Sequence, residues 1–299
     1  TSDNTDEKNL LEGQLEGQNN ISSNTPFSRI NYTIWSDVYE CGNCASDLVF
    51  WDEFYNDDVN KLETTVACPK CGSTQTKKSM QRKFISEFDA QLDMVVNIAK
   101  QVPVVIDYTN LRGERKQKKP DEVDIKLIEH IKGLKVADSV NPLPNGVNTE
   151  QPRKSHGVEY LHQFYTARNL AVMNKLRAIA KESNYRKQLL FLISSYDLSH
   201  STKMSRIIFK KGKKPVLTGY QSGTLYISSL PIEKNILTGI EKQKLPIISK
   251  SLKEIENNNI VQVGSASNLS LPSNSLDYIF IDPPFGANIN YSELNIIAE

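Results

Sequence analysis

The stretch LDYIFIDPPFG, residues Leu276 to Gly286, decides the expected fold. Its first six residues are mostly apolar, with β-branched and aromatic character, which predicts a buried strand. The strand should end at Asp282, because neither of the two prolines that follow has an N–H to donate to a ladder. A carboxylate, rigid carbonyls and an aromatic ring thus gather at the carboxyl end of a strand. In open α/β sheets that edge is where ligands bind.

The cluster suits chemistry on the exocyclic amine of a nucleobase, whose lone pair is delocalised into the ring. The Asp282 carboxylate can accept one amino hydrogen, and the Pro283 carbonyl, held rigid by Pro284, can accept the other. Both contacts favour a tetrahedral, more nucleophilic nitrogen. Phe285 offers a face on which a flipped-out base can stack. The alternative is a strand that ends in an ordinary Pro-Pro turn.

Residues 282–285, DPPF, resemble the catalytic motif of amino-methylating DNA methyltransferases, the N6-adenine and N4-cytosine class. The runs DPPFGANINYSELN (282–295) and YLHQFYTARNL (160–170) resemble large bacterial DNA methylases that carry a zinc-ribbon insertion. The resemblance implies a Rossmann-like α/β catalytic domain, S-adenosylmethionine as methyl donor and DNA as substrate. It implies catalytic roles for Asp282, Pro283, Pro284 and Phe285.

Within that class, Asp as the first motif residue favours adenine N6, whereas cytosine-N4 enzymes more often have Ser. Cytosine N4 and RNA stay open as alternatives. A rival from a different class is a non-catalytic zinc-ribbon DNA-binding protein with a degenerate methylase fold.

The resemblance also implies where the cofactor binds. Asp282 would contact S-adenosylmethionine, as would Ser265, which follows a short strand expected at 260–263. Many methyltransferases have an acidic residue in the place of Ser265, so this contact is expected to be weaker. The glycine-rich loop that holds the methionine part of the cofactor is absent from residues 1–299. We therefore expect a fragment that is inactive alone, whose partner is the upstream part of the same catalytic domain.

All four cysteines lie in two C-x-x-C pairs, Cys41 with Cys44 and Cys68 with Cys71. This spacing is typical of a zinc ribbon, in which two tight turns supply four thiolates to one tetrahedral Zn²⁺. Two disulfides or a redox dithiol fit less well, because the chain has no secretory features. Four thiolates leave no open coordination position, so the zinc is expected to be structural.

The composition is that of a globular protein, with 38% hydrophobic and 24% charged residues and a formal net charge of +1. No apolar run is long enough to span a bilayer, so we expect a cytoplasmic protein that does not contact membranes. Positive charge gathers in three places, each suited to DNA phosphates or simply to a solvated surface. They are Lys77–Lys78 with Arg82–Lys83, Arg112–Lys119 and Lys203–Lys214.

The expected organisation has four parts. They are a flexible polar connector (1–28), a zinc ribbon (29–84), an insertion suited to target recognition (85–155) and the C-terminal part of the catalytic domain (156–299).

Local patterns predict several elements. Strands are expected at 34–39, 48–51, 102–108 and 224–230, loops at 112–119 and 138–155, and helices at 123–134 after Asp121 and from Thr166 to about Glu182. Residues 189–195 are expected to form a buried strand or helix. His162 has no evident partner and is interpreted as structural rather than catalytic.

Overall fold

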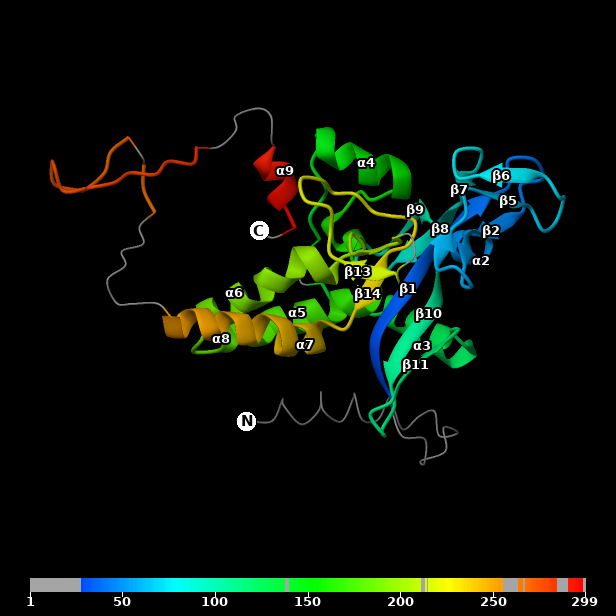
Figure 1. The fold of residues 1–299 in the computed structure, drawn as a ribbon, viewed down its shortest axis with the longest axis horizontal. Coiled ribbons are helices and arrows are strands. Elements are labelled where there is room, and N and C mark those ends of the chain that lie inside the picture. The colour runs from blue at the N-terminus through cyan, green and yellow to red at the C-terminus, as the bar shows by residue number, and fades with distance from the viewer. Residues whose placement is uncertain are drawn as a thin grey trace.

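The computed structural model describes residues 28–137, 140–210, 213, 215–254, 263–265, 267–283 and 290–297. It is a mixed α and β fold centred on one long strand, β1 (Arg29–Glu40) (Figure 1). Residues Tyr32 to Tyr39 of β1 are all buried, so both faces of the strand are covered. This explains why the strand carries apolar side chains without a strict polar alternation.

β1 belongs to two antiparallel assemblies. Its N-terminal part pairs with β10 (Gln101–Thr109) and β14 (Ile232–Lys234), and β11 (Arg115–Lys118) lies beyond β10. Its C-terminal end pairs with β2 (Asp47–Val49) and β7 (Gln81–Arg82). The register with β10 shifts twice, between Ile30 and Tyr32 and between Ile34 and Trp35, and such bulges bend a strand and increase its twist.

The shorter strands form four antiparallel pairs. They are β3 (Tyr55–Asn56) with β4 (Lys61–Leu62), β5 (Thr65–Ala67) with β6 (Thr74–Thr76), β8 (Phe84–Asp89) with β9 (Met94–Ala99), and β12 (Arg206–Ile208) with β13 (Val216–Thr218). Every strand pair in the described part of the chain is antiparallel. The parallel Rossmann-like sheet therefore stays a prediction.

In chain order the helices are α2 (Phe50–Phe54), α3 (Glu122–Lys132), α4 (Val147–His156), η1 (Leu161–Phe164), α5 (Ala167–Glu182), α6 (Arg186–Tyr196), η2 (Asp197–Ser201), α7 (Ile236–Gly239), η3 (Ile240–Lys244), α8 (Leu245–Glu254) and α9 (Tyr291–Asn295). Most of the helices, from α4 to α9, lie to the left of β1 in Figure 1, away from β2, β5 and β6 on the right. Helices α5 and α6 pack around a hydrophobic core. Its most deeply buried side chains, each at most 1% exposed, include Phe164, Met173, Tyr196, Met204 and Ile227.

Two helix starts agree with the sequence prediction, because both are set by local capping. Asp121 accepts hydrogen bonds from the backbone N–H groups of Val123 and Asp124, and Asp124 bonds back to complete a capping box. Thr166 caps α5 through the N–H of Asn169. The expected strands at 34–39 and 102–108 are present as parts of β1 and β10.

Other local predictions need correction. The expected loops at 112–119 and 138–155 contain β11 and α4. For residues 189–195, where the sequence left strand and helix open, the structure has a helix, α6. The strand expected at 48–51 ends at Val49, where α2 begins. No strand forms at 224–230, where Leu225 and Ile227 are buried in the helical core without a ladder. Tertiary packing overrides local preference at each of these places.

The strand expected at 276–281 is also wrong for the described structure. Residues 276–283 have no regular secondary structure, and Tyr278, Ile279, Phe280 and Ile281 are between 62% and 80% exposed. A strand needs a neighbour to take its backbone hydrogen bonds, and no described segment pairs with this one. The strand expected at 260–263 falls mostly outside the described residues.

The four-part division of the chain stays a prediction, but β1 bears on it. The same strand carries the ladder to β2 and β7 beside the cysteines and the ladder to β10 and β14 beside the helices. These regions are therefore joined by continuous backbone pairing rather than by a linker. The connector expected at 1–28 lies almost wholly outside the described residues.

Candidate functional site: a four-cysteine metal centre and a buried cavity

The four cysteines converge as the sequence predicts. Their sulfur atoms all lie within 4.8 Å of one another, and none is in a disulfide. The Sγ atoms of Cys41 and Cys71 are 3.8 Å apart, as are those of Cys44 and Cys68. A tetrahedron with Zn–S bonds of about 2.3 Å has edges of about 3.8 Å, so the spacing fits a metal ion such as zinc. A disulfide would need about 2.05 Å.

Two turns of nearly the same design hold the thiolates. In the first, the N–H of Ala45 bonds to the carbonyl of Cys41, and in the second the N–H of Gly72 bonds to that of Cys68, at 2.9 and 2.8 Å. The residue after the second cysteine has a positive φ in both turns, 53° at Ala45 and 71° at Gly72. Glycine adopts this conformation readily, whereas alanine does so at a cost.

Hydrogen bonds favour the thiolate form, which a metal requires, at Cys41 and Cys71, whereas the pKa of Cys44 is raised. The Ser73 hydroxyl lies 3.0 Å from the Cys71 sulfur, and its side chain and backbone together with Asn43 lower the pKa of Cys71 to about 5. Backbone N–H groups of Asn43 and Cys44 lower the pKa of Cys41. Cys41 and Cys68 are buried, so the centre is closed on one side by protein.

The basic residues after the second turn are largely engaged within the fold. Arg82 bonds to the buried Asp37 at 2.6 Å, and Lys83 lies 2.5 Å from Asp47. Lys77 covers the ring of Phe50, with 5.2 Å from Nζ to the ring centroid. These contacts hold the basic side chains against the protein. Fewer of them are therefore free to bind DNA phosphates than the sequence alone suggests.

The methylase-like motif is only partly within the described structure. Asp282 and Pro283 are exposed, and Pro284 and Phe285 lie outside the described residues. Ser265 is exposed, and its hydroxyl lies 2.8 Å from that of Ser267. No hydrogen bond or ion pair among the described residues joins Ser265 to Asp282.

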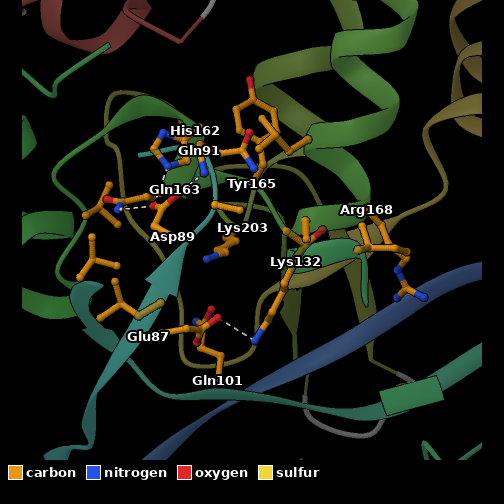
Figure 2. A pocket seen from close by; sticks show the side chains of 18 of the residues that line it. Glu87, Asp89, Gln91, Gln101, Lys132, His162, Gln163, Tyr165, Arg168 and Lys203 are labelled. Atoms are coloured by element: carbon orange, nitrogen blue, oxygen red, sulfur yellow. Dashed lines mark hydrogen bonds and ion pairs between the residues drawn. The ribbon is translucent and has the colours of Figure 1, made fainter. Parts of the chain in front are cut away.

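A cavity that no sequence pattern indicated lies between α3, the β8–β9 hairpin and the start of α5 (Figure 2). It has a volume of about 150 Å³. One wall is apolar and includes Val96, Ile98, Ile128, Ile131 and Val136. The polar wall carries three carboxylates and three cations, most of them labelled in Figure 2: Glu87, Asp89, Glu233, Lys132, Arg168 and Lys203.

Each carboxylate of the cavity wall has a partner. Glu87 pairs with Lys132 at 2.9 Å, and Glu233 with Arg168 at 2.5 Å. Asp89 is held by Nε2 of His162 at 2.8 Å and by Gln163 at 3.2 Å. His162 therefore has the partner that the sequence could not reveal.

A further carboxylate, that of Asp37 in β1, is buried next to the cavity, beside the lining residues Gln101 and His156. It accepts hydrogen bonds from Arg82 at 2.6 Å and Gln101 at 2.9 Å, and Nε2 of His156 is 3.4 Å away. Burial alone would raise the pKa of Asp37, but the nearby His156, then Arg82 and Gln101, outweigh it and lower the pKa to about 2. Desolvation lowers the pKa of His156 in turn.

Comparison with known proteins gives no assignment. No protein-family model, curated protein or solved structure matches the chain. Among the described residues, no helix has both the length and the apolar character needed to cross a bilayer.

Proposed function

We propose that this chain is part of an S-adenosylmethionine-dependent DNA methyltransferase that methylates the exocyclic N6 of adenine. The observation that carries the proposal is the run DPPFGANINYSELN at 282–295, which directly follows an apolar segment. In this role Asp282 and the Pro283 carbonyl accept the two amino hydrogens of the target base. Phe285 would stack on the base. Bound S-adenosylmethionine would supply the methyl group to the nitrogen and leave as S-adenosylhomocysteine, while the amine would lose one proton.

The exposure of residues 276–281 supports the proposal. Consecutive large apolar side chains are rarely this exposed on the surface of a complete folded domain, yet Tyr278 and Phe280 are 80% and 78% exposed. They are the side chains expected of a strand whose sheet neighbours come from elsewhere. The proposed neighbour is the upstream part of the same catalytic domain, which would also supply the glycine-rich cofactor loop.

In the same proposal the four cysteines hold one structural Zn²⁺. A closed set of four thiolates has no place for a substrate or water, so the metal organises the fold rather than reacting. The Zn²⁺ fixes the turns at Cys41 and Cys68 beside the C-terminal end of β1, and DNA is the partner proposed for this end of the molecule.

A second candidate is a non-catalytic zinc-ribbon protein that binds DNA. The observation that favours it is a contrast between the two motifs. The four cysteine sulfurs lie close enough together to bind a metal, whereas Asp282 is exposed and belongs to no sheet of the described structure. Cytosine N4 and RNA remain alternatives to adenine N6 within the enzyme proposal.

The deciding experiment uses the chain extended by, or mixed with, the upstream segment. Asp282→Ala should abolish methyl transfer while leaving DNA binding largely intact, because phosphate contacts dominate affinity. The matched control is Asp58→Ala, which removes an exposed carboxylate of the cysteine region. Mass spectrometry of nucleosides from the methylated DNA separates N6-methyladenine from N4-methylcytosine. Normal turnover by Asp282→Ala would contradict the enzyme proposal, and absence of methylation by the unaltered protein would favour the second candidate.

A further inference from the structure

Lys203 is the one cation on the cavity wall without a partner among the described residues. Lys132 and Arg168 pair with Glu87 and Glu233, whereas no hydrogen bond or ion pair within the described structure involves Nζ of Lys203. Figure 2 shows its side chain projecting into the cavity between Asp89 and Lys132. Surrounding protein desolvates the ammonium, and this lowers the pKa of Lys203 to about 8 against the opposing charges of Glu87, Asp37 and Asp89. An unpaired ammonium in such a place is costly to the fold.

The first turn of α5 also lines the cavity. Thr166, Ala167 and Arg168 all line the cavity, and α5 is 16 residues long. Thr166 caps the N–H of Asn169, but the N–H groups of Ala167 and Arg168 find no acceptor in the described part of the chain. Free N–H groups at a helix start, together with the helix dipole, favour a negative group.

The opposite wall and the volume define the rest of the ligand. Branched aliphatic side chains from β9 and α3, including Ile98 and Ile131, suit an apolar body rather than a sugar or a second charge. A cavity of about 150 Å³ holds one benzene-sized ring. Three carboxylates in the wall disfavour a dianion such as a phosphate monoester, which carries about −1.5 to −2 at neutral pH.

We propose that this cavity binds a small monocarboxylate whose apolar body is about the size of one aromatic ring. The carboxylate lies at the start of α5, where it accepts hydrogen bonds from Lys203 and from the N–H groups of Ala167 and Arg168. The ring lies against β9 and α3. The site is distinct from residues 282–285 and does not depend on the methyltransferase proposal.

The test uses benzoate as the probe and benzamide, an uncharged molecule of nearly the same shape, as the control. Benzoate should raise the melting temperature of the whole chain in proportion to its occupancy, and benzamide should raise it much less. Trp35 lines the cavity and is one of two tryptophans, so in a Trp51→Phe background its fluorescence reports binding at this place. Equal stabilisation by both probes, or no stabilisation by benzoate, would overturn the proposal.

Two variants remove the carboxylate contacts separately. Lys203→Met should lose at least about tenfold in benzoate affinity, the loss expected for one charge-assisted hydrogen bond. It should also melt higher than the parent in the absence of ligand, because a half-buried ammonium that has no partner among the described residues is gone. Ala167→Pro removes one N–H donor yet keeps α5, since proline suits the first helical position, and should weaken benzoate a few-fold.

Lys126→Met is the matched control, because Lys126 lies on the exposed face of α3 with Glu122 as its partner. It should bind benzoate as the parent does. Should Lys203→Met fail to fold, Ala167→Pro still decides the question. Benzoate affinity that is unchanged in the folded variants would assign the binding to another place and refute the proposed site.

Discussion

Arg168 donates from Nε to Oε1 of Glu233 at 2.5 Å, and this pair fastens the first turn of α5 to β14. Arg168 also donates to the hydroxyl of Thr33 at 2.9 Å, and Glu233 accepts from the indole of Trp35 at 2.8 Å. Both Thr33 and Trp35 belong to β1. The helical layer is thus tied to the central sheet by polar contacts that are mostly shielded from water.

The first prediction concerns this pair. Arg168→Ala should lower the free energy of unfolding by about 3–5 kcal/mol, because it leaves the carboxylate of Glu233 buried without its cation. Replacing both residues, as Arg168→Met with Glu233→Leu, should cost less than Arg168→Ala alone. Denaturant unfolding of the two variants measures the difference. A double variant less stable than the single one would show that the pair contributes net stability.

The second prediction is that the chain binds one Zn²⁺. Cys41→Ser should release the metal and unfold the region around the two turns, because metal binding there supplies folding free energy. Elemental analysis and circular dichroism check this, with Lys70→Ala, an exposed turn residue, as control. Purified protein without metal and with the cysteines oxidised in pairs would contradict it.

The third prediction tests the strained turn residue. Ala45→Gly should tighten zinc binding, because alanine at a φ of 53° carries a steric cost of about 1–2 kcal/mol that glycine avoids. Gly72→Ala should weaken it by a similar amount. A Cβ at residue 72 would meet nothing within 4 Å, so the effect there is one of backbone conformation alone. Competition with a chelator gives both affinities.

The fourth prediction is a pH dependence of stability. His200 stacks on Tyr196, with 4.7 Å between ring centroids, and desolvation, followed by the charges of Lys234 and Lys244, lowers the pKa of His200 to about 4. In the unfolded chain the group titrates near its ordinary value of about 6.5. The unfolded state therefore binds the proton first, and stability falls as the pH drops from about 6.5 to about 4.

His200→Gln should make the free energy of unfolding less sensitive to pH across that window. His156 has a lowered pKa as well, so part of the dependence remains in the variant. His130→Gln, at an exposed position of α3, is the control. Equal pH slopes for parent and His200→Gln would contradict the prediction.

Local signals explain what the sequence predicted well. Caps at Asp121 and Thr166 act within three residues of themselves, and each cysteine pair closes a turn within a few residues. The long-range step, which brings Cys41 to Cys71, follows from the coordination chemistry of zinc. The metal centre can therefore be inferred from the spacing of the cysteines alone.

The cavity could not be inferred in the same way. Lys203 lies within a basic run that favours phosphate contact, and nothing local indicates that it would project into a cavity beside Asp89. That arrangement depends on how α3, β9 and α5 pack together, and no pattern along the chain records it. The prediction for 276–281 failed for a related reason: its apolar run predicts a strand, but a strand exists only when a partner pairs with it.

The length of β1 has a mechanical consequence. The ladder to β10 ends at Asp37 and the ladder to β2 begins at Val38, so the backbone of β1 itself connects the sheet beside the helices to the cysteine region. A change in the relative orientation of the two regions has to bend or twist this strand. A partner that binds the cysteine region therefore acts on the helical layer through the backbone of β1.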